Sequence, residues 1–304
     1  MRKILLGSLA VLALAACSNE ENNHAESGNG RATFTASIDG RTATRAFDQS
    51  WESGDAIGIT GKSGEIPYSN VKYATTGDGN FTVATQGQEI YYEDDNEVSF
   101  TAYYPWNAST TITANTLEQS KQKTFDFLHA TGKGSKVQPN VAFKFYHKMA
   151  KVVLTVKKGD DVSFSEVKAA LPTLGGFLAE GTFDGLTGKT SVTGTQTATL
   201  VFADNAPTKE NAEDETVSYT LILFPQEFSG KLPFSAELEG MQTFSAALDF
   251  TAANATIDKD AAKNAWVAGR QYNLSVTLHK TKLTVDGCTI APWNEADGGN
   301  FDAE

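Results

Sequence analysis

Hydrophobic and polar residues alternate along most of this chain with a period of two. At residues 33–38 the apolar side chains of Phe34, Ala36 and Ile38 alternate with Thr and Ser, and an Asp-Gly pair follows as a turn. This alternation is typical of a β-strand with one buried face. The same pattern recurs at residues 98–104, 152–156, 219–223, 232–238, 244–250 and 272–278. The apolar positions expected to be buried include Phe34, Ile38, Phe100, Leu154, Leu223 and Leu274.

Short alternating strands separated by turn residues predict antiparallel β-sandwiches. With 304 residues, 40% of them hydrophobic, the chain is long enough for two such domains. We therefore expect an all-β protein with two tandem antiparallel β-sandwich domains, residues 32–140 and 141–304, divided just after a Gly-rich polar run at 131–136. Short helices are expected only at 166–171 and 258–267.

The N-terminus carries an export signal. Two basic residues precede an apolar run that ends at Ala16, and Cys17 follows directly. A charged start, a short apolar middle and small residues before a cysteine predict a lipoprotein signal peptide at residues 1–16, with lipid attached to Cys17. The alternative is a permanent membrane helix, but the run falls short of the roughly 20 apolar residues that span a bilayer. Residues 17–31 are polar and acidic, which predicts a flexible tether.

The net charge and the cysteine and histidine residues argue against several classes of function. The formal net charge of -12 disfavours nucleic-acid binding, because an acidic chain repels phosphate backbones. Once Cys17 carries lipid, Cys288 has no partner for an internal disulfide, and we expect it to be a buried thiol. The four histidines lack metal-ligand spacing, and the sequence has no nucleophile motif. We expect no catalysis, no metal and no cofactor. A glycosidase remains the enzymatic alternative, because its two carboxylates are assembled in space.

Several short segments together resemble a known family. They occur in the family's order at residues 47–59, 100–105, 143–152, 266–274 and 290–293. On these segments the chain resembles the fimbrillin-like family, the type V pilus subunits of Bacteroides-type bacteria. The resemblance implies two tandem transthyretin-like β-sandwiches and export as a lipoprotein. It also implies cleavage by an Arg-specific protease after the first strand, followed by polymerisation when a strand of another subunit fills the vacated groove.

The resemblance also suggests where these steps would occur. Arg45 follows the strand at 33–38 within a short polar segment, so it is the candidate cleavage site, with Arg41 as second choice. The alternative is that both are ordinary surface arginines. The residues expected to take part in strand exchange are Phe34, Ala36 and Ile38 of the first strand and Leu283, Val285 and Ile290 of residues 282–293. The segment 282–293 is either a donated strand or the last intramolecular strand, and both interpretations stay open.

The predicted function is a structural fimbrial subunit or pilus-associated adhesin on the outer membrane surface and in the fimbrium. The acidic residues after Cys17 resemble a surface-export signal, the alternative being a solvated linker. Expected partners are other pilin subunits, the maturation protease, the outer membrane through the lipid, and a host or bacterial surface glycan or protein. The alternative function is a glycan-binding surface lipoprotein with Trp51, Trp106 or Trp293 exposed as a stacking platform. The pilin hypothesis instead expects Trp51 and Trp293 to be buried and the strand at 33–38 to lie at an accessible sheet edge.

Overall fold

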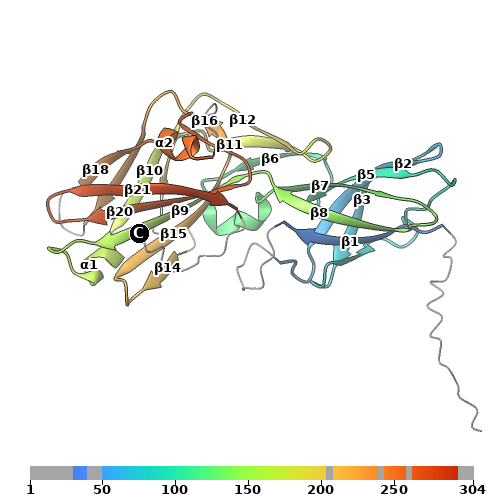
Figure 1. Cartoon of the computed structure of the whole chain (residues 1–304), viewed down its shortest axis with the longest axis horizontal. Coiled ribbons are helices and arrows are strands. Elements are labelled where there is room, and N and C mark those ends of the chain that lie inside the picture. The colour runs from blue at the N-terminus through green and yellow to red at the C-terminus, as the bar shows by residue number, and fades with distance from the viewer. Residues whose placement is uncertain (1–29, 40–49, 203–207, 239–242, 258–261, 294–304) are drawn as a thin grey trace, which may run out of the picture.

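The computed structural model describes residues 30–39, 50–202, 208–238, 243–257 and 262–293. Two β-rich parts lie end to end along the long axis of the molecule (Figure 1). The strands are β1 (Thr33–Ile38), β2 (Ala56–Ser63), β3 (Ile66–Thr75), β4 (Asn80–Val83), β5 (Val98–Tyr104), β6 (Thr111–Asn115), β7 (Leu128–Gly134), β8 (Asn140–His147), β9 (Ala150–Lys158), β10 (Leu171–Phe177), β11 (Glu180–Asp184), β12 (Lys189–Val192), β13 (Ala198–Val201), β14 (Thr208–Asn211), β15 (Thr216–Leu223), β16 (Gln226–Glu227), β17 (Leu232–Glu237), β18 (Thr243–Leu248), β19 (Ala265–Trp266), β20 (Arg270–Leu278) and β21 (Leu283–Pro292). The helices are the 3-10 helix η1 (Gln119–Thr124), α1 (Phe164–Ala169) and α2 (Thr251–Ala255).

The N-terminal part is a closed, barrel-like sheet of seven strands in the order β1-β4-β3-β2-β5-β7-β8. β1 closes it, because all of its residues pair in parallel with β8 while Phe34 and Thr35 also pair antiparallel with β4. The interior is filled by a core rich in aromatic side chains, among them Trp51, Phe100 and Phe143. The all-β prediction is confirmed. This part is a closed sheet and not the antiparallel sandwich expected, because alternation does not reveal a parallel pair between strands far apart in sequence.

The C-terminal part is built from two main sheets. One has the order β13-β10-β17-β18 and the other the order β14-β15-β9-β20-β21. Leu174 and Phe234 of the first sheet and Leu154 and Leu274 of the second belong to one buried cluster. The two sheets therefore form the layers of a sandwich around a shared core. Here too one pair is parallel, that between β9 and β20.

A third apolar cluster joins the two parts. It includes Tyr103 and Phe127 from the N-terminal part and Phe183, Ile222 and Trp293 from the C-terminal part. The rings of Phe127 and Phe183 stack with their centroids 4.6 Å apart. In addition, β6 pairs with β11 across the junction. The two parts are thus packed against each other through an apolar interface with its own small sheet.

The structure changes the predicted boundary after residue 140. β8 (Asn140–His147) belongs to the closed sheet, and the chain enters the C-terminal sheet only at Ala150, the first residue of β9. The Gly-rich run that resembled a linker lies partly in β7. A Cβ at Gly132 would lie 2.6 Å from the Val141 side chain, and one at Gly134 would lie 2.1 Å from the Tyr92 hydroxyl. These glycines therefore serve close packing.

The predicted core is confirmed, whereas only one of the two predicted helices is. The six apolar residues expected to be buried are at most 5% exposed. The helix expected at 166–171 is α1, which starts earlier because Ser163 and Glu166 form a capping box. Residues 258–261 of the other expected helix lie outside the described residues, and within its described part Ala265 and Trp266 form β19 instead. Among the described residues, no helix is long and apolar enough to cross a membrane.

Candidate functional site at the terminal strands

β1 fills a groove in the closed sheet with alternate side chains. Phe34, Ala36 and Ile38 are 2%, 8% and 5% exposed. The Phe34 ring lies edge-on to Tyr73 and Phe100, with ring centroids 4.8 Å and 5.5 Å away. Edge-to-face pairs of this kind add to the stabilisation that comes from burial alone. Removal of β1 would therefore uncover an apolar groove with aromatic walls.

The backbone of β1 is hydrogen-bonded on both sides. β8 pairs along its whole length on one side. On the other side the Ala36 amide donates to the Gly79 carbonyl at 2.8 Å, and the Trp51 indole Nε1 donates to the Ala36 carbonyl at 2.9 Å. The expectation that this strand lies at an accessible sheet edge is wrong, because β4 and Trp51 cover the side opposite β8.

The predicted lipidation and cleavage residues Cys17, Arg41 and Arg45 lie outside the described residues. The residues that flank the arginines, however, are held firmly. The Asp39 amide donates to the Phe145 carbonyl at 2.8 Å. Beyond the segment, Trp51 is 4% exposed and packs edge-on to Phe145 and other aromatic rings. Chain on either side of residues 40–49 is therefore fixed to the same sheet.

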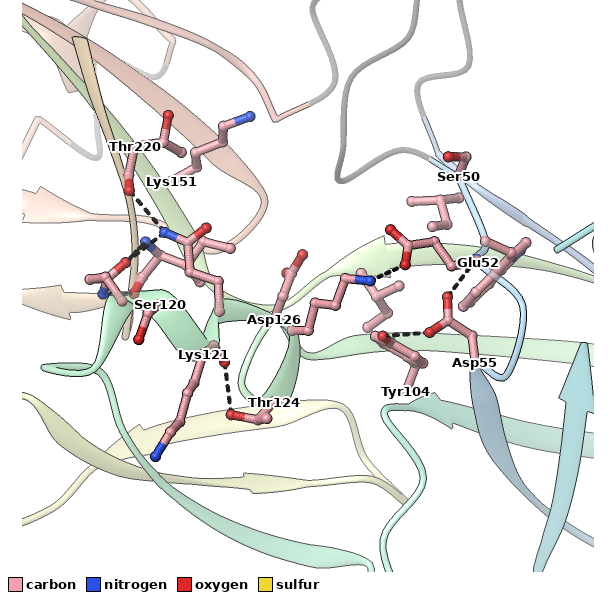
Figure 2. A pocket seen from close by; sticks show the side chains of 17 residues that line it. Ser50, Glu52, Asp55, Tyr104, Ser120, Lys121, Thr124, Asp126, Lys151 and Thr220 are labelled. Carbon is pink, nitrogen blue, oxygen red and sulfur yellow. Dashed lines mark hydrogen bonds and ion pairs between the residues drawn. The ribbon is translucent and has the colours of Figure 1, made fainter. Parts of the chain in front are cut away.

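A hollow of about 740 Å³ lies between the two parts, beside these flanking residues (Figure 2). Ile38 at the end of β1 and Ser50 line it from the N-terminal part. Residues of η1, which donates hydrogen bonds to β15 through Gln119 and Gln122, line the opposite wall together with Thr220 and Ile222. The hollow therefore lies between the residues that flank the candidate cleavage segment and the interface of the two parts.

Polar contacts fix one wall of this hollow. Lys123 of η1 forms an ion pair with Glu52 and so connects η1 to the turn after Trp51. Asp55 accepts a hydrogen bond from the Glu52 amide at 2.8 Å and another from the Tyr104 hydroxyl at 3.0 Å (Figure 2). Burial and the neighbouring carboxylate raise the pKa of Tyr104, so this hydroxyl keeps its proton and remains a donor at neutral pH. The turn after Trp51 is thereby held in one conformation.

β21 is the outer strand of the five-stranded sheet and pairs antiparallel with β20. Leu283 and Ile290 are half-buried against the C-terminal core, whereas Val285 is 36% exposed. In this structure the segment is the last intramolecular strand, which is one of the two interpretations that the sequence left open. Burial of Cys288, which packs against the core from the same strand, raises the pKa of its thiol to about 12.

Trp293 follows β21 and is 1% exposed. Its ring stacks on His147, the last residue of β8, with the ring centroids 4.2 Å apart and the planes inclined by 11°. The Nδ1 atom of His147 lies 2.8 Å from an Asp126 carboxylate oxygen. The Trp293 amide donates to the Gly269 carbonyl at 3.2 Å. Sequence analysis did not find this arrangement, because its members are far apart in the chain and share no motif.

The described residues form neither a metal site nor an exposed tryptophan platform. In the ranges that the structure describes, His, Cys, Asp and Glu side chains form no group of three or more that could hold a metal ion. Trp51 and Trp293 are buried, as the pilin hypothesis expects. Trp106 is half-buried, and the Lys72 ammonium lies 4.5 Å from its ring centroid. These three side chains therefore do not form the exposed platform that the glycan-binding alternative needs.

The fold and the terminal strands define a class: a two-part all-β protein in which a strand near the N-terminus fills a groove of its own sheet. A family model described as Fimbrillin-like matches residues 44–293. The chain belongs to this family.

Individual relatives are similar to this chain over most of its length. A protein of Bacteroides uniformis that is named as a fimbrium subunit, Fim1C, is 28% identical, over 97% of this chain and 96% of that protein. The crystal structure of a protein from the same species, described as a cell adhesion protein, is similar with a TM-score of 0.67 and 27% identity. The similarity covers 87% of this chain and 100% of that one. A protein from Bacteroides ovatus shares the fold, with a TM-score of 0.68 at 22% identity over 88% of this chain and 99% of that one.

Proposed function

We propose that this chain is a fimbrial subunit or a pilus-associated adhesin at the cell surface. The family, the relative named as a fimbrium subunit and the similar structure described as a cell adhesion protein support this proposal. The family is a structural one, so the proposal assigns no reaction and no cofactor. Lipid on Cys17 would hold the subunit at the outer membrane. The surface glycan or protein that an adhesin would bind is also part of the proposal.

The observation that carries the proposal is the position of β1. It is the first strand among the described residues and is inserted between β8 and β4, and its three alternate apolar side chains are buried. Loss of this strand would expose apolar surface and unpaired backbone groups on two neighbours at once. Such a sheet binds an added strand strongly, through ladder hydrogen bonds and side-chain pockets.

Arg45 and β21 supply the two further steps. Cleavage after Arg45 by an Arg-specific protease would separate β1 covalently from the rest of the sheet. A second copy would then offer Leu283, Val285 and Ile290 of its C-terminal strand to the vacated groove. β21 suits this role because it is an edge strand whose apolar side chains are exposed or only half-buried.

The test is limited trypsin digestion of the purified full-length chain, followed by mass spectrometry and native gel electrophoresis. We expect cleavage after Arg45, then loss of β1 and a ladder of oligomers. In the variant Arg45→Ala the bond after residue 45 should stay intact, and the double variant Arg41→Ala/Arg45→Ala should remain monomeric under the same conditions. The variant Arg41→Ala is the matched control, since it removes a neighbouring arginine and should assemble like the wild type.

Two outcomes contradict the proposal at different steps. If trypsin cuts elsewhere while the bond after Arg45 stays intact, the cleavage site is wrong. If that bond is cut and no oligomers form, strand exchange through the β1 groove is wrong.

A further inference from the structure

β21 is attached unevenly along its length. All ten of its residues are half-buried or exposed, and Val285 has an apolar side chain that is 36% exposed. At Asp286 the ladder with β20 shifts register, so the regular pairing is interrupted there. Leu283, Cys288 and Ile290 pack against the C-terminal core, and each is only partly buried. The strand alone therefore contributes little buried apolar surface to its own attachment.

The residue directly after the strand is buried in a different place. Trp293 belongs to the apolar cluster at the junction of the two parts, together with Phe127, Met149 and Phe183. Its ring covers His147, whose Nε2 atom is buried and has no hydrogen-bond partner among the residues that the structure describes. A large aromatic side chain in a closed site contributes far more to attachment than several half-exposed side chains.

We propose that Trp293 is the residue that holds β21 on its own subunit, and that withdrawal of its ring from the junction is the step that frees β21 for another copy of the chain. The second part of this inference rests on the proposed strand exchange. The first part does not, since it concerns the monomer alone.

The surroundings of the ring place this step beside β1. Asp39 at the end of β1, His147 at the end of β8 and Trp293 line one hollow of about 390 Å³. β8 pairs with β1 through six successive residues, and it pairs with β7 at Leu128 and His129. The strand that carries His147 therefore depends on β1 for much of its backbone pairing. The position of Trp293 makes its site sensitive to the presence of β1.

Amide hydrogen exchange on the uncut full-length chain tests the attachment directly. In Trp293→Ala the amides of β21 should exchange at least about tenfold faster than in the wild type, while those of β9 and β15 change little. Val285→Ala is the matched control, because it shortens an exposed side chain on the same strand and should change exchange by less than about twofold. Trp293→Phe keeps an aromatic ring and should recover most of the protection.

Three results would overturn the inference. The first is unchanged exchange of β21 in Trp293→Ala, and the second is equal acceleration in β9 and β21, which would indicate general destabilisation. The third concerns trypsin-treated protein, in which Trp293→Ala should assemble faster than the wild type. If β21 is freed and assembly is no faster, the link to donation is wrong. If no variant assembles at all, the proposed strand exchange fails, while the exchange data still decide what holds β21.

Discussion

The two terminal strands differ in a way that their lengths do not predict. β1 has six residues and β21 has ten. In β1 every second side chain is buried in the core of the closed sheet, whereas most of β21 is exposed and its best-buried neighbour is Trp293, just beyond its end. Because the stabilisation of a strand follows the apolar surface it buries, the shorter strand is the more firmly held.

Their pairing partners differ as well. β1 pairs in parallel with β8, whose sequence position is more than a hundred residues away, while β21 follows its partner β20 after a short turn. β9 and β20 repeat the parallel arrangement in the C-terminal part. β1 thus completes a closed sheet, and β21 is added to the edge of one that is already complete (Figure 1). Removing β1 should disturb its whole sheet, whereas removing β21 should not.

The largest expected effect tests this contrast. Phe34→Ala in β1 deletes a ring that packs against Tyr73 and Phe100 and should lower the free energy of unfolding by about 3–5 kcal/mol. Ile290→Ala in β21 removes a half-buried side chain and should cost about 1–2 kcal/mol. Urea denaturation of both variants measures the difference. Equal losses would contradict the conclusion that β1 is the more firmly held strand.

A smaller effect is expected at Gly79, which touches β1 from the opposite side to β8. Its φ is +80°, and an added Cβ would lie 2.8 Å from the Ala36 carbonyl oxygen. Gly79→Ala should therefore combine backbone strain of about 1–2 kcal/mol with a clash that displaces β1. Gly87 is the matched control, because it has a φ of +87° and open space around its Cβ position. The excess loss of stability in Gly79→Ala over Gly87→Ala isolates the contact with β1, and no excess would mean that β1 shifts freely.

The positions of the strands could be predicted from the sequence better than their pairing partners in the sheets. Alternation located β1, β5, β9, β15, β17, β18 and β20 and identified most of their buried side chains, although Phe244 and Ala246 of β18 are only half-buried. It did not indicate that β1 and β9 each pair with a distant parallel strand, because a period of two specifies a face and not a partner. The boundary was misplaced for a similar reason: the closeness of Gly132 to Val141 exists only after β7 and β8 lie together.

The candidate site could be predicted in its parts and not in its assembly. Phe34, Ala36 and Ile38 were identified from local alternation, and burial of Trp51 and Trp293 was expected from the family resemblance. The stacking of Trp293 on His147 joins residues that are 146 positions apart, by an aromatic contact without a sequence motif. Cys17 and Arg45 lie outside the described residues, and their roles stay predictions.

The thiol of Cys288 can report on the attachment of β21 through its rate of alkylation. Burial raises the pKa of this thiol from its usual value of 9.0 to about 12. The native thiol therefore keeps its proton between about pH 9 and 12, where the thiol of a detached strand has lost it. Because the detached form releases its proton first, attachment of β21 should be strongest below pH 9 and should weaken as the pH rises through this window.

Alkylation by iodoacetamide, resolved by peptide mass spectrometry, follows this difference, because the thiolate is the form that reacts. In the native chain the rate at Cys288 should stay low at pH 9 and rise only toward pH 12. In urea the profile should be centred near 9, and Trp293→Ala should shift the native profile toward that of the denatured chain. Phe34→Ala, studied where it remains folded with β1 in place, should leave the profile of Cys288 unchanged, because Phe34 packs in the core of the closed sheet and not at the Trp293 site. A native profile already centred near pH 9 would show that β21 is open to solvent along its length. In that case β1 would be attached to its sheet and β21 would not.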